Sequence, residues 1–525
     1  MPGTDPLTIP AAVDLAAQRF PDSDAVLDGP VRIGFAELRE RVRTVARALI
    51  AEGLQPGERV AVCAPNTHHW VLAALGALYA GAALVPINTR FTGAESLDVL
   101  RRSRARALVV AGEFLGVDRL EQVREANGGP LDRLRTTIRV PVEGELEPVA
   151  GTRRWDELEE LAAQVPASRI DEVAAAVRPD DVSDVLFTSG TTGRSKGAMS
   201  AHRQALGVAR SWAERAAVTS DDRYLVINPF FHSFGYKAGI LVCLLRGAAL
   251  LPQATFDVAE VLRRVESERV TVLPGPPTIY QSMLDHPDRD RHDLSSLRLA
   301  VTGAATVPVV LVERMQQELS FDTVLTAYGL TEAVVATMCR PEDDDETVAR
   351  TCGRAASGLE VRVVDRDGTP LPPGEAGEVQ VRGPNVMLGY LDDEEATAKA
   401  IDRDGWLHTG DVGRLDERGY LTITDRLKDM YICGGFNVYP AEVEQVLARL
   451  EGVAEVAVVG VPDERLGEVG KAFVVANAEL SAEEVLAHCR DRLANYKRPR
   501  QVEFRTELPR NPSGKVLKRL LRDLH

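Results

Sequence analysis

Apolar residues recur with helical and strand-like spacing in alternation through the first two-thirds of the chain. Leu38, Val42, Val45 and Leu49 form one helical stripe, because residues three or four apart share a helix face. Helices are also expected at residues 238–245 and 258–265. Short apolar runs typical of buried strands lie at residues 59–63, 84–85, 107–111, 224–227, 249–251, 270–273 and 299–302. This alternation predicts parallel sheets covered by helices, in two related αβ halves.

One uncharged run, residues 70–87, has the length of a short membrane span. Alanine and glycine dominate it, polar residues flank it, and Pro86 interrupts its end. The pattern favours a buried helix to Ala80, a stop at Gly81 and a short strand after it. We therefore expect no transmembrane segment.

The pattern changes after about residue 355, where short strands alternate with Gly, Pro and Asp turns. Strands are expected at 359–364, 378–382 and 420–424, which indicates a β-rich subdomain. Farther on, Pro440 begins a helix, and Ser481 with Glu484 forms a capping-box pattern at the start of another. The expected fold class is α/β. A large N-terminal domain (residues 1–424) holds two αβ subdomains and the β-rich subdomain, a hinge spans 425–429, and a small mobile α+β domain spans 430–525.

Composition narrows the function classes. The 525 residues include 62 Lys and Arg against 78 Asp and Glu, a net charge of −16. So acidic a chain repels phosphate backbones, which argues against nucleic acid as a partner. The six cysteines contain no CxxC pair, and the N-terminus lacks a signal-peptide pattern, so a cytoplasmic protein is expected.

The strongest chemical signal is the glycine-rich segment that follows the apolar strand 184–187. Its glycines allow successive backbone N–H groups to face one anion, while hydroxyls and the cations Arg194 and Lys196 add donors and charge. The spacing of Gly190 and Gly193 is not that of a Walker A loop. A flexible linker is the alternative interpretation, but the preceding strand and the cations weigh against it.

This loop resembles the phosphate loop of the adenylate-forming superfamily of acyl-CoA synthetases, adenylation domains and luciferases. Five further segments resemble motifs of that superfamily and occur in the same order. They are Tyr328-Gly-Leu-Thr-Glu332, Gly405-Trp-Leu-His-Thr-Gly-Asp411, Asp425-Arg-Leu-Lys-Asp429, Gly434-Gly-Phe436 with Tyr439-Pro-Ala-Glu442, and Pro509-Arg-Asn-Pro-Ser-Gly-Lys515.

The resemblance implies a nucleotide site. Its ATP or AMP contacts would be Thr188, Ser189, Gly190, Thr191, Thr192, Gly193, Lys196, Gly303, Ala304, Ala305, Ala327, Tyr328, Gly329, Leu330, Thr331, Asp411, Arg426 and Lys515. Tyr328 would stack on adenine, and Asp411 would accept hydrogen bonds from the ribose. Glu332, assisted by Thr188, would bind Mg²⁺. The alternative for Glu332 is an ordinary acid at a helix N-terminus, capped by Thr331.

The resemblance also implies catalytic and CoA-binding residues. The catalytic residues would be Lys515, Thr188, Glu332 and His232. Lys515 would bridge the carboxylate and the α-phosphate, and its acetylation would remove that charge; a surface lysine in a basic tail is the alternative. Lys428 would be the hinge of a domain rotation. The rotation would present Gly434, Gly435 and Phe436 to the pantetheine arm of CoA.

An aromatic segment at 228–236 resembles the wall of the acid pocket in this superfamily. The pocket residues would be Phe230, His232, Phe234, Gly303 and Tyr328. His232 could equally be a structural histidine, and the phenylalanines could be core residues. The longer stretches 228–241, 271–281, 300–315 and 429–439 resemble actinobacterial ligases of steroid catabolism. Those ligases activate a methyl-dioxo-octahydroindene propanoate, abbreviated HIP below.

The expected function is therefore that of an ATP-dependent, AMP-forming ligase of a carboxylic acid and CoA, with Mg²⁺ as the cofactor. HIP or a related steroid fragment is the first candidate acid, a medium- or long-chain fatty acid the second, and an aryl acid the third. An enzyme that loads a carrier protein, a luciferase-like oxygenase and a non-catalytic nucleotide-binding regulator are the alternatives. A homodimer stays open.

Overall fold

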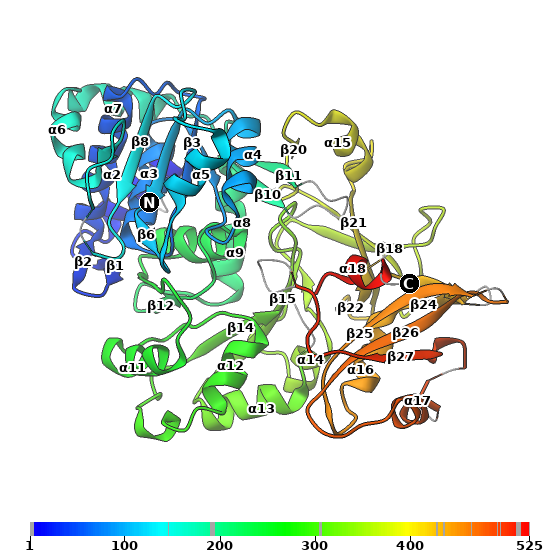
Figure 1. Ribbon diagram of the computed structural model, residues 1–525. Helices are drawn as coiled ribbons and strands as arrows, with labels where there is room; N and C mark the ends of the chain where they lie inside the picture. The colour runs from blue at the N-terminus through cyan, green and yellow to red at the C-terminus, as the bar shows by residue number, and fades with distance from the viewer. Residues whose placement is uncertain are drawn as a thin grey trace. The chain divides into compact units, whose positions relative to one another are not determined.

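The computed structural model describes residues 5–144, 146–188, 195–303, 307–426, 429–433, 436–463, 465–490, 492–493, 495–510 and 516–523, with the side chains of 425–426 and 436–437 left out. Two compact units are present (Figure 1). The first comprises residues 1–360 and 381–407, and the second comprises 361–380 and 408–525. The boundary at residue 424 and the hinge at 425–429 stay predictions.

The first unit contains an eight-stranded sheet. In spatial order its strands are β20 (Gly389–Tyr390), β11 (Lys196–Ala201), β10 (Val182–Thr188), β4 (Ala83–Pro86), β3 (Arg59–Cys63), β5 (Ala107–Ala111), β8 (Thr136–Val140) and β9 (Arg153–Arg154). From β10 to β9 neighbouring strands run parallel, whereas β11 pairs antiparallel with both β10 and β20. The β10–β11 pair therefore brings together the two residues, Thr188 and Lys196, between which the predicted phosphate loop lies in the sequence.

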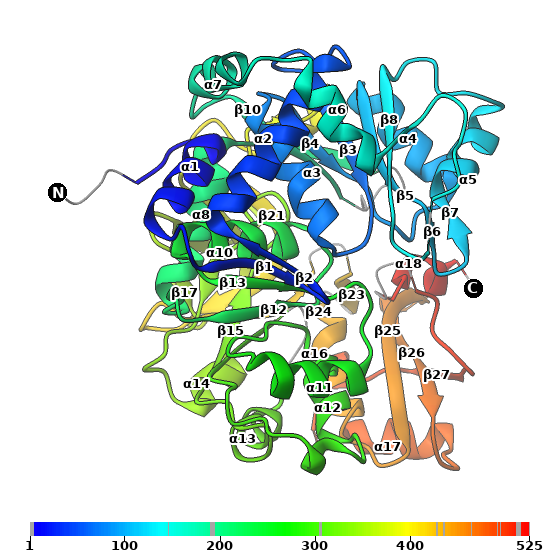
Figure 2. The ribbon, with the colours of Figure 1, turned by 90° about the vertical axis from the view of Figure 1, so that its left-hand side faces the viewer.

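The second sheet of this unit consists of two four-stranded ribbons joined at Val272. The strands are β2 (Val31–Gly34), β1 (Asp24–Asp28), β13 (Ala249–Pro252) and β12 (Arg223–Val226), then β14 (Leu299–Gly303), β15 (Thr323–Tyr328), β16 (Thr337–Met338) and β17 (Arg354–Ala355). Figure 2 shows β1, β13 and β12 side by side. The strand expected at 270–273 is reduced to single bridges from Val272 to Tyr224 and Leu299. Prolines at 274, 276 and 277 lack the N–H groups that a longer ladder needs.

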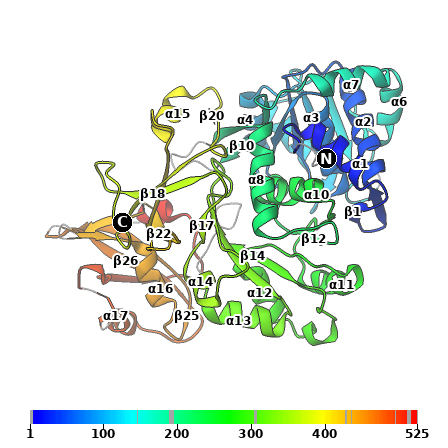
Figure 3. The same cartoon turned by 180° about the vertical axis from the view of Figure 1, so that it is seen from behind.

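Helices cover these sheets, and α8 and α10 lie next to each other in Figure 3. The helices are α1 (Ile9–Arg19), α2 (Phe35–Ala51), α3 (His68–Tyr79), α4 (Gly93–Ser103), α5 (Arg119–Asn127), α6 (Leu158–Ala163), α7 (Ala167–Ala176), α8 (His202–Arg215), α9 (Ser233–Gly235), α10 (Leu241–Arg246), α11 (Val258–Glu268), α12 (Pro277–Leu284), α13 (Val309–Glu318), α14 (Asp345–Arg350) and α15 (Glu394–Ala400). A π-helical turn, Tyr236–Ile240, links α9 to α10. A short ribbon joins β6 (Glu113–Phe114) and β7 (Val117–Asp118).

The uncharged run at 70–87 forms α3 and β4, as expected. Thr67 caps α3 by accepting from the Trp70 N–H, and the helix ends before Gly81, which has a φ of +73°. At Gly76 a Cβ atom would lie 2.6 Å from the Val45 side chain, so α2 packs closely on α3. Within the described ranges, no helix is long and apolar enough to cross a membrane.

The second unit contains two further sheets. The first orders β18 (Glu360–Val364), β19 (Gly377–Arg382), β21 (Leu407–Leu415) and β22 (Leu421–Arg426). The second orders β24 (Phe436–Val438), β23 (Tyr431–Cys433), β26 (Gly467–Ala476) and β25 (Val453–Asp463), with β27 (Gln501–Phe504) parallel to β26. Its helices are α16 (Pro440–Leu447), α17 (Ala482–Arg490) and α18 (Lys518–Arg522). Reciprocal hydrogen bonds between Ser481 and Glu484 confirm the predicted capping box.

Candidate active site

The β10–β11 hairpin holds the two ends of the predicted phosphate loop together. Thr188 and Lys196 face each other across the antiparallel pair, and the Thr188 hydroxyl donates to the Lys196 carbonyl at 3.4 Å. This rung fixes one hydroxyl and one cation where the loop begins and ends. The predicted loop contacts Ser189, Gly190, Thr191, Thr192 and Gly193 lie outside the described residues.

A chain of three side chains leads from this rung to Glu332. The Lys196 ammonium lies 4.9 Å from the centre of the Tyr390 ring, and the Tyr390 hydroxyl donates to Glu332 Oε1 at 2.8 Å. Burial, reinforced by the Glu332 carboxylate, raises the pKa of Tyr390 above its ordinary value, so the phenol stays a donor. Strand β20 carries Tyr390 alongside β11, and the Met387 N–H donates to the Glu332 carbonyl. The geometry thus holds a cation near the ring of Tyr390 and a carboxylate at its hydroxyl.

The alternative interpretation of Glu332, as an acid at a helix N-terminus, is wrong. Glu332 lies in a turn after β15, in which the Ala333 N–H donates to the Leu330 carbonyl. At Val334 the chain adopts a φ of +60°, which does not continue a helix. The carboxylate therefore has no helix of its own to stabilise.

The predicted adenine-side residues gather at the carboxyl ends of two parallel strands. Gly303 ends β14 and pairs with Ala327 on β15, and Tyr328 follows. A Cβ atom at Gly303 would lie 2.4 Å from the Ala327 carbonyl oxygen, so only glycine fits there. Gly329, Leu330 and Thr331 continue into the turn that carries Glu332. Ligands of α/β proteins commonly bind at such strand ends. Ala304 and Ala305 lie outside the described residues.

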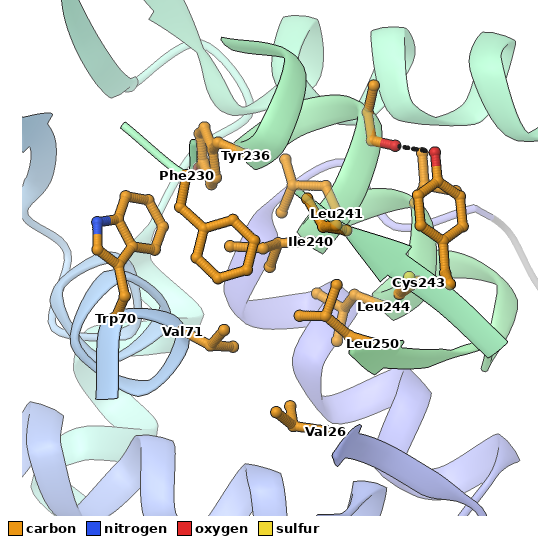
Figure 4. Close-up of a cluster of buried hydrophobic side chains, with 14 of the residues drawn as sticks. Val26, Trp70, Val71, Phe230, Tyr236, Ile240, Leu241, Cys243, Leu244 and Leu250 are labelled. Atoms are coloured by element: carbon orange, nitrogen blue, oxygen red, sulfur yellow. Dashed lines mark hydrogen bonds between the residues drawn. The ribbon is translucent and has the colours of Figure 1, made fainter. Parts of the chain in front are cut away.

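Within the aromatic segment at 228–236, His232 is the N-cap of α9. Its Nδ1 accepts from the Phe234 N–H at 3.2 Å, and loss of hydration among surrounding protein atoms lowers the pKa of the imidazole, although solvent still reaches the side chain. Phe234 is half-buried, and its ring meets Trp212 edge-on at 5.0 Å. Phe230 is fully buried against Trp70, with ring centres 5.3 Å apart (Figure 4). Phe230 is a core residue here, and its contact with the acid stays a prediction.

The second unit carries the predicted ribose-binding residues. Asp411 lies on β21, is buried, and its N–H donates to the Thr409 hydroxyl at 3.1 Å. Arg426 is its partner across the β21–β22 ladder, so these two positions are brought together. The side chains of Arg426 and Phe436 lie outside the described part of the chain, as do Lys428, Gly434, Gly435 and Lys515.

Sequence reasoning missed Tyr390. It stands 58 residues after Glu332 in the chain, so no local period or motif spacing connects the two. In the sequence, a single tyrosine beside Gly389 is indistinguishable from a residue of an ordinary turn. The pairing of β20 with β11, together with the hydrogen bond from the Met387 N–H to the Glu332 carbonyl, brings the phenol to the carboxylate.

Residues 13–391 match the family described as AMP-binding enzyme, and residues 442–515 match the AMP-binding enzyme C-terminal domain. The chain belongs to the AMP-binding enzyme family. It is 61% identical over 520 residues to a methyl-dioxo-octahydroindenyl propanoyl:CoA ligase of Rhodococcus jostii, with 99% of both chains covered. It is 59% identical to the ligase of the same description from Mycobacterium tuberculosis, covering 98% of this chain and 99% of the relative.

Solved structures agree. The ATP-bound MatB of Rhodopseudomonas palustris superimposes with a TM-score of 0.85 at 30% identity, with 98% of both chains covered. The anthranilate CoA ligase AuaEII, in complex with anthranoyl-AMP, gives 0.85 at 28% identity, covering 99% of this chain and 97% of the other. The expected fold class is confirmed, as is the expected enzyme class, an AMP-forming acid–thiol ligase that uses ATP and CoA.

Proposed function

We propose that this protein joins HIP to CoA in two steps, through a HIP-adenylate. The observation that carries the proposal is the near-complete coverage at 61% and 59% identity by two ligases of this acid from two genera. Relatives that act on other acids are more distant, with a feruloyl-CoA synthase of Amycolatopsis at 39% and a long-chain-fatty-acid–CoA ligase of Mycobacterium tuberculosis at 34%.

In the first step a carboxylate oxygen of the acid attacks the α-phosphorus of ATP. An O–P bond forms, the bond to the β-phosphate bridge breaks, and pyrophosphate leaves. Negative groups approach one another, so the site must supply cations and donors. Thr188 and Lys196 would hold the outer phosphates, Lys515 would bridge the carboxylate and the α-phosphate, and Tyr328 with the Gly303 strand end would receive adenine.

Glu332 fits a magnesium ligand. Mg²⁺ in nucleotide sites takes one or two carboxylates together with phosphate oxygens. Glu332 is half-buried, and Tyr390 holds its Oε1 by a 2.8 Å hydrogen bond. Within the described ranges no cluster of three or more metal-ligating side chains occurs. When bound, Mg²⁺ supplies charge neutralisation, and the protein's part is to orient Glu332, with Thr188 beside the phosphates.

In the second step the CoA thiolate attacks the acyl carbonyl carbon. A C–S bond forms, the C–O bond to AMP breaks, and the thiol proton passes to solvent. A rotation at Lys428 would withdraw Lys515 and bring Gly434, Gly435 and Phe436 to the pantetheine arm. Glycines suit such a passage because backbone can approach the ligand closely. The division into residues 1–424 and 430–525 belongs to this proposal, as do a cytoplasmic location, a homodimer and regulation by acetylation of Lys515.

The experiment is mass spectrometry of CoA esters after incubation with ATP, Mg²⁺, CoA and one acid at a time. HIP, a C8 and a C16 fatty acid, and ferulate represent the competing classes. We expect HIP-CoA to form with the highest kcat/KM. If a fatty or aryl CoA ester forms faster, HIP is not the preferred acid and the substrate belongs to that other class. Acyl-adenylate without any CoA ester would favour a carrier-protein loader.

A further inference from the structure

We propose that the buried ion pair between Lys237 and Asp184 positions the chain around His232 relative to the hairpin that carries Thr188 and Lys196. The inference rests on the proposed adenylation chemistry. It assigns a role to two buried residues that the proposed function does not place in contact with the nucleotide or the acid, and it concerns the first unit alone.

The pair is a closed polar cluster inside the protein. Lys237 Nζ lies 2.8 Å from Asp184 Oδ1, and the two side chains are 1% and 0% exposed. Lys237 also donates to the Ser200 hydroxyl at 2.8 Å. The other carboxylate oxygen, Oδ2, accepts from the Ser183 hydroxyl at 2.7 Å, and that hydroxyl also reaches the Ser200 carbonyl at 3.1 Å.

The cluster lies on the same face of the hairpin as the pair Thr188 and Lys196. Asp184 faces Ser200 across β10 and β11, just as Thr188 faces Lys196. Even spacing along a strand keeps side chains on one face, and four residues span about 13 Å. Lys237 therefore contacts the hairpin, at Asp184, roughly 13 Å from the predicted phosphate-binding end.

On the other side the pair holds the aromatic segment. Lys237 lies in the π-helical turn Tyr236–Ile240, five residues after His232. The Ala238 carbonyl in this turn accepts from the Tyr224 hydroxyl at 2.7 Å. Single π-turns inside helices are frequent at functional sites. This turn aims Lys237 inward at Asp184, while the chain before it presents His232 and Phe234.

Stability alone does not explain such a pair. Burying two charges costs several kcal/mol per ion, and replacing both partners by apolar residues is often neutral or stabilising. Removing one partner is costly because the other charge is left unpaired. What the pair does supply is direction: one ammonium, 2.8 Å from one carboxylate oxygen and donating to one hydroxyl, fixes how the π-turn packs on β10. Misplacing a reacting group by about 1 Å can cost roughly 10²-fold in rate.

The test compares the double variant D184L/K237M with wild type. Folding is followed by near-UV circular dichroism and thermal unfolding, and acid-dependent pyrophosphate release gives kcat and KM for the acid and for ATP. We expect a folded double variant whose kcat falls at least tenfold, because the acid segment and the hairpin lose their common register. A folded double variant with wild-type kcat and both KM values would overturn the positioning role.

Two further variants keep the test decisive. Arg264 is a buried cation on α11 that donates to the carbonyls of Pro252 and Leu27, so R264M controls for general loss of stability. An equal fall in kcat in R264M would contradict the proposal.

If D184L/K237M does not fold, D184N/K237M replaces it, because Asn can still accept from Ser183, and the same outcomes apply. Wild type in the same assay separates the two hypotheses: no acid-dependent release by wild type contradicts the proposed function, whereas active wild type beside an equally active double variant contradicts only the positioning role.

Discussion

Tyr390 donates a 2.8 Å hydrogen bond to Glu332 Oε1 from a strand 58 residues farther along the chain. The bond orients one carboxylate oxygen, and under the proposed function the other would bind Mg²⁺. Because the Lys196 ammonium lies 4.9 Å from the centre of the same ring, Tyr390 contacts both a positive and a negative group at the predicted phosphate end of the site.

Y390F should weaken the response of the enzyme to Mg²⁺. A hydrogen bond to a charged group contributes about 1.5–3 kcal/mol, which corresponds to roughly a 10- to 100-fold change in the half-saturating Mg²⁺ concentration. The measurement is pyrophosphate release titrated with Mg²⁺ at fixed ATP. Y79F is the matched control, since the Tyr79 hydroxyl also donates to a carboxylate, Asp14, at 2.9 Å. An unchanged Mg²⁺ titration in Y390F would refute the orienting role of the phenol.

G303A should lose nucleotide affinity. The added Cβ would lie 2.4 Å from the Ala327 carbonyl oxygen, so β14 and β15 must move apart where adenine is expected. We expect the Kd for ATP, measured by calorimetry, to rise at least tenfold, with a lower Tm. G34A is the control, because its Cβ would make an ordinary contact of 3.5 Å with the Ser23 carbonyl oxygen. Wild-type ATP affinity in G303A would contradict the adenine assignment.

K515A should separate the two half-reactions. Removing a preorganised charge from the adenylation step should slow acid-dependent pyrophosphate release by about 10²–10³-fold. Thioester formation from supplied HIP-adenylate should stay within a few-fold of wild type. K518A is the control, because Lys518 pairs with Glu444 at 2.8 Å within the second unit. Equal loss of both half-reactions would show that the two steps do not use alternate arrangements of the domain.

Acid should destabilise the first unit through His202. Burial lowers the pKa of His202 to about 4, and its neutral Nδ1 accepts from the Ile9 N–H at 3.2 Å. Above pH ~6.5 the imidazole is neutral in both folded and unfolded chains, so its titration does not change the free energy of unfolding there. As pH falls from ~6.5 to about 4, only the unfolded chain takes up the proton, and the free energy of unfolding drops by up to about 3 kcal/mol.

The matched variant for this titration is H202N, whose amide oxygen can still accept from Ile9 without titrating. Denaturant unfolding across pH 4 to 7 should give a shallower pH slope for H202N than for wild type. His69, whose pKa burial lowers to about 3, adds a slope of the same sign to both proteins. Parallel pH profiles would show that His202 does not contribute.

Local patterns predicted much of the fold, and distant pairings explain what they missed. The run 70–87 and the Ser481 cap carry their structural signals within a few residues, and both are confirmed. The strand predicted at 270–273 is reduced to single bridges at Val272, because prolines just beyond it lack the N–H donors that a longer ladder needs. Tyr390 with Glu332, and Lys237 with Asp184, are joined only by strand order and helix packing, which apolar periodicity does not encode.

Nucleotide analysis of a reaction containing HIP, CoA, ATP and Mg²⁺ addresses the central claim most directly. We expect AMP and pyrophosphate to appear in equal amounts, with one HIP-CoA for each AMP, and no AMP when HIP is left out. Formation of ADP, or no nucleotide cleavage in the complete mixture, would contradict an acyl-adenylate route to the thioester.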